Sequence, residues 1–501
     1  RTVQNVIALA MPFAATRERG DYIAFTGIET ITEKEEAEMN DDKQPLTAPK
    51  PHVYHEKKRA IKKQRGGISE GQLVFIGLAS ILGAGFFLAT ATTIRETGLS
   101  ILLSYLIGVF AVWTIFDAFG AMLAAEPGHR GSFLYFVEKY LGGLFAFVGG
   151  WIYWASGVMT MSSEITGISI FTQKWLPSVP IWLLSCVYAL LALGINGIGM
   201  KNYGRVESLF AILKSAALVV FIGIVFYFIL GGREGPPSHF TEIDLWFTHG
   251  LTGFLTSLSM MFFTFGGIIA TGLATAEVET IQIIPRAFRK IVFLLASLYL
   301  VSLFAVLYVT PVTEITPKRS PMVTTLSLLR IPFADEVLNG IMITAAFSTA
   351  IAAMFGVSHI LVNLSKRHEA PAVLAKINHR GVPVPSLLVT TVFLFITIAA
   401  SYFLPGAIYE LLTTSAGVVF LLLWGMILFS FIKFKNAAAY RSVRVWGVPW
   451  RIRLSLSILA VAFFGTVFDK RHLISMLISV VFAATAGIFY RFFFGKMSKA
   501  G

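Results

Sequence analysis

Residues 71–93 read GQLVFIGLASILGAGFFLATATT, an apolar run with two glycines, Gly83 and Gly85, near its middle. The run is long enough to cross the roughly 30 Å hydrocarbon core of a bilayer as a helix. Each glycine costs about 1 kcal/mol relative to alanine inside a helix. Glycines at this depth predict an interrupted helix, which is tolerated in a membrane only where the freed backbone groups are buried in protein or line a cavity.

Eleven further apolar blocks follow. The chain of 501 residues is 55% hydrophobic and 14% charged, against about 25% charged residues in soluble proteins. A transmembrane β-barrel would show short alternating segments instead. We therefore predict an all-α integral membrane protein with 12 transmembrane helices, at 71–93, 99–125, 143–172, 179–199, 206–231, 250–276, 290–311, 337–365, 383–404, 406–433, 451–468 and 472–494.

The positive charge lies in the connections between these blocks. The formal net charge is +13. If the segment before the first block is cytoplasmic, the cytoplasmic connections hold 26 Lys and Arg residues and the opposite side holds 8. This bias predicts a multi-pass protein of the bacterial cell (plasma) membrane with both termini in the cytoplasm. Membrane topology accounts for the charge, so we expect a lipid bilayer and no nucleic acid as partner.

The segments that flank the blocks are polar. We expect residues 1–66 to form a disordered cytoplasmic N-terminal tail, residues 67–495 the twelve-helix domain and residues 496–501 a cytoplasmic C-terminal tail. Lys34-Glu35-Glu36 can be encoded by a purine run that resembles a ribosome-binding site upstream of Met39. One hypothesis is that residues 1–38 are translated leader and that Met39 is the natural start. The alternative is a genuine tail, and the nucleotide sequence decides between the two.

A second glycine pair occurs in the sixth block, where residues 260–279 read MMFFTFGGIIATGLATAEVE, with Gly266 and Gly267 near the middle. Blocks one and six each begin a set of five. Interrupted helices at equivalent positions of two halves are typical of transporters built from an inverted repeat. The alternative is close helix packing through small residues.

Several segments together resemble one family: LGAGFFLATATTIRETGLSILLSYLIG (82–108), GSFLYFVEKYLGGLFAFVGGWIYW (131–154), SSEITGISIF (162–171), FTFGGIIATGLATAEVETIQIIPRAF (263–288) and KINHRGVPVPSLL (376–388). They resemble the amino acid–polyamine–organocation (APC) superfamily, and within it the bacterial amino acid transporter (AAT) branch of amino acid permeases. The resemblance covers about residues 68–495. It implies a LeuT-like fold, a 5+5 inverted repeat with broken helices 1 and 6, and a central site between helices 1, 3, 6, 8 and 10.

The two interruptions can bind an amino acid zwitterion. The half-helix that begins at the first interruption offers free N–H groups and a positive dipole end to a carboxylate. Carbonyls freed at the second can accept hydrogen bonds from the ammonium group. The predicted substrate-binding residues are Ser80, Ile81, Leu82, Gly83, Ala84, Gly85, Phe263, Thr264, Phe265, Gly266, Gly267 and Ile269.

Ionisable residues inside apolar blocks are functional candidates by default. Lys214 matches the helix-5 lysine that, in the resembling family, takes the place of a sodium ion, and Glu164 matches a helix-3 glutamate of that branch. We expect both to take part in proton coupling, with Ser348 and Thr349 supplying hydroxyls near the lysine. The alternatives are a lysine that reaches the headgroups, a carboxylate in a water-filled vestibule, and hydroxyls that only join helices.

The branch commonly carries a glutamate two residues past the helix-6 glycines and an asparagine in helix 8. This chain has Ile269 and Ile351 there. We therefore expect proton-coupled import of a neutral apolar amino acid, branched-chain or aromatic, with the proton gradient in place of any cofactor. An amino acid exchanger is the alternative, and an amino acid sensor a remote one. Motifs for zinc, for an esterase nucleophile or for a phosphate loop were not found, so we expect no enzyme and no metal. We also expect a monomer or a weak homo-oligomer.

Overall fold

A computed structural model describes residues 68–83, 85–126, 133–198, 203–231, 245–275, 278–404, 406–437, 440, 445 and 447–493. Within these ranges the chain is helical, with one isolated parallel β-bridge, between Ile68 and Val278, and no strand. This agrees with the predicted all-α class. The predicted tails, 1–66 and 496–501, lie outside the described residues.

The helices follow the apolar blocks. They are α4 (Glu70–Ile81), η1 (Gly85–Ala89), α5 (Thr90–Thr97), η2 (Gly98–Ser100), α6 (Ile101–Ala125), α7 (Phe133–Leu141), α8 (Gly143–Gln173), α9 (Ile181–Ile198), α10 (Tyr203–Leu230), α11 (Gly250–Phe263), α12 (Ile268–Ala274), α13 (Ile283–Val309), η7 (Val312–Glu314), α14 (Pro321–Leu328), α15 (Ala334–Lys366), η8 (Ala372–Ala375), α16 (Val384–Phe403), α17 (Ile408–Phe434), α18 (Val448–Gly465), η10 (Thr466–Phe468) and α19 (Lys470–Phe493).

Eleven stretches of the described chain are long and apolar enough to cross a membrane, where the sequence predicts twelve. The difference lies in the first predicted block, 71–93. Its interruption leaves α4 with only 12 residues, and the remainder is continuous with α6 in one stretch, Gly85–Ala125. Within that stretch Gly98, with φ +66°, ends α5 before α6 begins.

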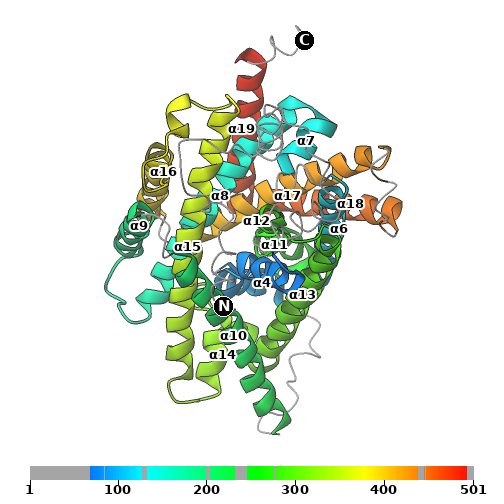
Figure 1. Ribbon diagram of the computed structural model, residues 1–501. Coiled ribbons are helices and arrows are strands. Elements are labelled where there is room, and N and C mark those ends of the chain that lie inside the picture. Colours follow the sequence, from blue (N-terminus) through cyan, green and yellow to red (C-terminus); the bar gives the residue numbers. More distant parts are fainter. Residues whose placement is uncertain are drawn as a thin grey trace, which may run out of the picture.

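The two interrupted segments lie in contact at the centre of the bundle. α4 packs against α12, and α5 packs against α11. Around them α6 packs against α13, α8 against α15, and α9 against α16. Figure 1 shows α9 and α16 together on one flank, beyond α8 and α15, with α6 and α18 on the other flank.

Main-chain hydrogen bonds join the interrupted segments at both ends. At the end where α4 begins, the Glu279 N–H donates to the Ile68 carbonyl at 3.1 Å. At the end where α11 begins, the Ser100 N–H donates to the Trp246 carbonyl, also at 3.1 Å. Each bond links the chain next to one interrupted helix with the chain next to the other.

A buried ion pair fixes α18 to α6. The Arg451 guanidinium, 1% exposed, donates to Asp117 Oδ2 at 2.9 Å and lies 3.7 Å from the centre of the Trp113 ring. Arg289 of α13 approaches the other oxygen of Asp117 at 3.5 Å. One carboxylate therefore links three helices, and sequence reasoning did not identify it.

Replacing Asp117 by leucine should lower stability strongly, because it leaves the Arg451 charge buried beside an apolar side chain. We expect a loss of about 3–5 kcal/mol, the usual cost of breaking one side of a buried pair. The double variant Asp117→Leu/Arg451→Met should recover much of this loss, since both charges are gone. Thermal unfolding in detergent measures both. Equal stability of the single and double variants would contradict the pairing.

Candidate functional site

The first interruption follows α4 directly. The helix begins with a capping box, in which the Gln72 N–H donates to Ser69 Oγ at 3.4 Å and the Ser69 N–H donates to Gln72 Oε1 at 2.9 Å. It ends at Ile81, and the chain leaves helical geometry at Leu82 before η1, a π-helical turn, starts at Gly85. The interruption lies where the glycine pair predicts it. Ala84 lies outside the described residues.

The second interruption is a tight turn, Thr264 to Gly267, between α11 and α12. The N–H groups of Thr264, Phe265 and Gly266 donate to carbonyls three residues earlier, at 3.0–3.1 Å. The Thr264 carbonyl accepts a hydrogen bond from Tyr299 Oη at 2.9 Å. This predicted ammonium acceptor therefore has a protein partner, although a carbonyl oxygen has a second lone pair.

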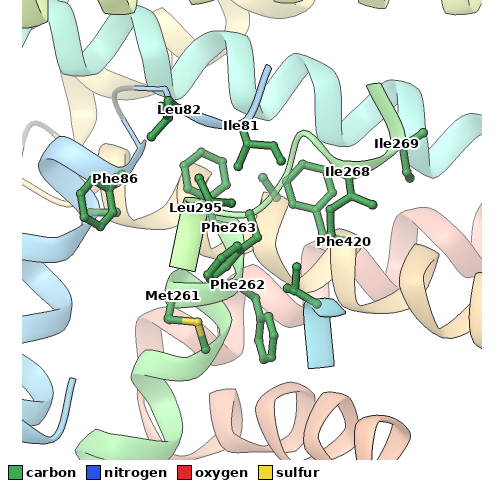
Figure 2. Close-up of a cluster of buried hydrophobic side chains, with 14 of the residues drawn as sticks. Ile81, Leu82, Phe86, Met261, Phe262, Phe263, Ile268, Ile269, Leu295 and Phe420 are labelled. Carbon is green, nitrogen blue, oxygen red and sulfur yellow. The ribbon is translucent and has the colours of Figure 1, made fainter. Parts of the chain in front are cut away.

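The two interruptions touch through glycine. A Cβ atom added at Gly267 would lie 2.7 Å from the Ser80 carbonyl carbon and 2.8 Å from Ile81 Cγ1. A Cβ atom added at Gly85 would lie 2.6 Å from the Phe263 ring. Figure 2 shows apolar side chains from both segments gathered in one cluster with Phe420 of α17. The glycines thus allow an approach that no larger residue would permit without displacement.

An acidic side chain from α8 faces the first interruption. A Cβ atom added at Gly83 would lie 2.8 Å from Glu164 Oε1 and 3.5 Å from Thr349 Cγ2. Glu164 is 2% exposed. The structure therefore brings this carboxylate against the backbone that the sequence assigns to the substrate carboxylate.

Lys214 lies on the far side of the same threonine. Its side chain is 1% exposed, and its Nζ donates to Thr349 Oγ1 at 3.4 Å. Thr349 Oγ1 in turn donates to the Ala345 carbonyl at 3.1 Å. Four helical segments meet here, and Thr349 bridges the lysine to the interruption. Ser348 is also buried, in the same turn of α15.

The resembling branch commonly has a glutamate and an asparagine at two positions that are isoleucines in this chain, and both isoleucines are buried. Ile269 and Ile351 are 1% and 3% exposed. Ile269 belongs to the apolar cluster of Figure 2. The Ile351 carbonyl accepts a hydrogen bond from Asn196 Nδ2 at 3.4 Å. Neither residue adds a polar side chain to the centre.

An aromatic cluster that sequence reasoning missed supports the second interruption. Phe86 stacks on Tyr299 with ring centres 3.8 Å apart, and Phe265 lies 5.3 Å from the same ring. Tyr105 packs edge-on against Tyr299, and its hydroxyl donates to Thr264 Oγ1 at 3.2 Å. Tyrosines are common in apolar blocks, so the sequence offers no signal that separates these two from ordinary packing residues.

Comparisons with known proteins find a matching family and several similar chains. Residues 72–488 match the model of the family described as "Amino acid permease". An uncharacterized transporter, YcgH, of Bacillus subtilis is 30% identical over 430 residues, which cover 85% of this chain and 94% of YcgH. The amino-acid permease AapA of B. subtilis is 30% identical, over 76% of this chain and 84% of AapA. The aromatic amino acid transport protein AroP of Escherichia coli is 30% identical, over 75% of this chain and 83% of AroP.

Gly267→Ala should destabilise the protein, because the added methyl group meets the Ser80 backbone. Overpacking of this kind costs about 1–3 kcal/mol. Gly425→Ala is a matched control in α17, where a Cβ atom would have no neighbour within 4 Å. It should leave stability unchanged or raise it by up to about 1 kcal/mol through helix propensity. Thermal unfolding in detergent compares the two, and an equal effect of both would contradict the close contact.

Proposed function

Because the chain belongs to the amino acid permease family, we propose that it imports a neutral apolar amino acid together with a proton across the bacterial plasma membrane. Family membership indicates a transporter rather than an enzyme. The observation that carries the proposal is the approach of Glu164 and Thr349 to Gly83, where both would meet an added Cβ atom, with Lys214 bonded to the same threonine.

The helix contacts support a LeuT-like inverted repeat of twelve transmembrane helices. In this scheme the interrupted pairs α4–α5 and α11–α12 are helices 1 and 6. The contacts then recur when helices 1–5 are exchanged with helices 6–10, helix 1 for 6, helix 2 for 7, and so on. α4 packs on α13 as α11 packs on α6, α10 packs on α15 as α17 packs on α8, and α10 packs on α13 as α17 packs on α6. A two-fold relation between the halves gives this pattern.

The Lys and Arg bias assigns the two ends of the molecule. With 26 of these residues on one side and 8 on the other, the end where α4 begins faces the cytoplasm. The end where α5 finishes and α11, α17 and α19 begin then faces outward. Both termini are cytoplasmic in this orientation.

The substrate would lie between the two interruptions. Its carboxylate would bind N–H groups at Gly83 and Gly85, at the start of the half-helix η1–α5. Its ammonium would bind carbonyls of the Thr264–Gly267 turn. Ser80, Ile81 and Leu82 would form the wall on the α4 side, and Phe263, Phe265 and Ile269 the wall on the other.

Proton coupling would use the two buried charges. Glu164 lies where the substrate carboxylate would approach, and two carboxylates at short range disfavour double ionisation. Substrate binding would therefore favour protonation of Glu164. Lys214 would act as a cation between α10 and α15, with its hydrogen bond to Thr349 linking its charge state to the backbone near Gly83. Ser348 would contribute a second hydroxyl from α15.

An apolar substrate side chain fits the surroundings. Ile269 and Ile351 offer no hydrogen-bonding side chain to a polar side chain of the substrate. Burying an unpaired polar group costs several kcal/mol in an apolar environment. AroP, one of the relatives, is described as an aromatic amino acid transport protein. Aromatic and branched-chain amino acids are therefore the proposed class.

Uptake into proteoliposomes tests the function. Labelled leucine and phenylalanine should be taken up faster with an inward proton gradient, and serine and lysine should not. Lys214→Ala should abolish the stimulation, whereas Lys376→Ala, which removes an exposed lysine of a connecting segment, should not. Uptake that ignores the gradient but requires amino acid inside would instead indicate an exchanger.

Glu164→Gln separates coupling from binding, because it keeps the shape of the side chain but cannot ionise. Gradient-driven accumulation of leucine should fall by about tenfold or more, within the usual range of coupling free energies of 1–3 kcal/mol. Exchange of external for internal leucine without a gradient should persist. Unchanged accumulation in this variant would remove Glu164 from the coupling mechanism.

A further inference from the structure

A buried histidine joins three helices at the end where α11 and α19 begin. His472, on the first turn of α19, is 2% exposed. Its Nδ1 lies 2.9 Å from the Thr256 carbonyl of α11, and its Nε2 lies 3.3 Å from Glu410 Oε1 of α17. Both ring nitrogens therefore face oxygen acceptors.

Neutral imidazole carries a proton on only one nitrogen, whereas imidazolium carries one on each. The charged ring can donate to Thr256 and to Glu410 at the same time. The neutral ring must leave one of these contacts without a hydrogen. The full connection between α11, α17 and α19 is thus a property of the protonated histidine.

The charges around the ring favour that form. One ring nitrogen of His472 and one carboxylate oxygen each of Glu410 and Asp469 all lie within 4.8 Å of one another. Asp469 Oδ1 accepts the N–H groups of Arg471 and His472 at 2.8 and 3.1 Å, which caps α19. Arg471 pairs with the second oxygen of Glu410 at 2.9 Å. α11 has no titratable side chain. The negative charge of Glu96, near the end of α5, interacts electrostatically with Arg471.

We propose that His472 is a positioning residue for transport: its imidazolium ties the outer half-helix α11 to α17 and α19. This inference rests on the proposed amino acid transport but not on proton coupling. α11 ends at Phe263, directly before the Thr264–Gly267 turn. Thr256 precedes Phe263 by seven residues, so the hydrogen bond from His472 holds α11 about two helical turns from one wall of the proposed substrate site. Loss of the proton removes one of the two hydrogen bonds, which weakens the connection between α11, α17 and α19 and slows the cycle.

Glu410→Gln is the decisive variant. The amide keeps an oxygen for Arg471 and offers an N–H to the neutral His472 Nε2, so the connection no longer needs the extra proton. Leucine counterflow should be measured at equal pH on both sides, to remove any gradient. In the wild type it should fall by about fivefold or more as pH rises above about 6.5, the ordinary pKa of imidazole, because the neighbouring carboxylates favour the charged ring. In Glu410→Gln it should stay constant.

Two further variants separate positioning from general damage. Ser475→Ala removes a hydrogen bond from α19 to the Leu411 carbonyl of α17 at 3.2 Å, one turn from His472, and carries no titratable group. It should keep the wild-type pH profile. His472→Gln cannot become a cation, so its counterflow should be slow at every pH, with a lower maximal rate and an unchanged half-saturating leucine concentration.

Thermal unfolding in detergent repeats the comparison without transport. The wild type should lose stability as pH rises through the same range, and Glu410→Gln should not. A wild-type pH profile in Glu410→Gln, by either measurement, would overturn the inference. If the unfolding profiles differ as expected but the wild type shows no counterflow at any pH, the proposed function is wrong, while the pH-dependent connection between α11, α17 and α19 is supported.

Discussion

The contact between the two interrupted helices is the constraint on which the rest of the structure depends. Lipid offers no hydrogen bonds, so a break in a membrane helix must be covered by protein. Here each break covers the other, with Gly267 against the Ser80 carbonyl and Gly85 against the Phe263 ring. The remaining helices surround this contact, and the hydroxyl of Tyr299 from α13 satisfies the Thr264 carbonyl that the second break exposes.

The same contact explains where the buried charges lie. Glu164 and Lys214 come from different helices, yet both reach the first break, one directly and the other through Thr349. Charges that are this deeply buried need polar neighbours, and Lys214 has one in the hydroxyl of Thr349. Asp117 and Arg451 instead neutralise each other away from the breaks, which suits a structural role in holding α18.

The sequence predicted those features that depend on one segment at a time. The lengths of the apolar runs predicted the helices, and the glycine pairs predicted where two of them are interrupted. Pairings between distant segments carry no such local signal. Asp117 lies within the second apolar block and its partner Arg451 is the first residue of the eleventh, and no sequence pattern linked the two. Tyr299 and His472 were missed for the same reason, since their roles arise from a carbonyl on another helix. The first block showed the limit of block counting, because its break left α4 with 12 residues.

The main-chain bonds at the two ends of the interrupted segments have an evolutionary consequence. The Glu279–Ile68 and Ser100–Trp246 hydrogen bonds use only peptide groups. Almost any residue can stand at these four positions without removing them, and only proline at a donor position abolishes the N–H. These two hydrogen bonds can therefore persist while the surrounding residues change in evolution. Alanine scanning would not detect them, because alanine keeps the peptide N–H and carbonyl groups.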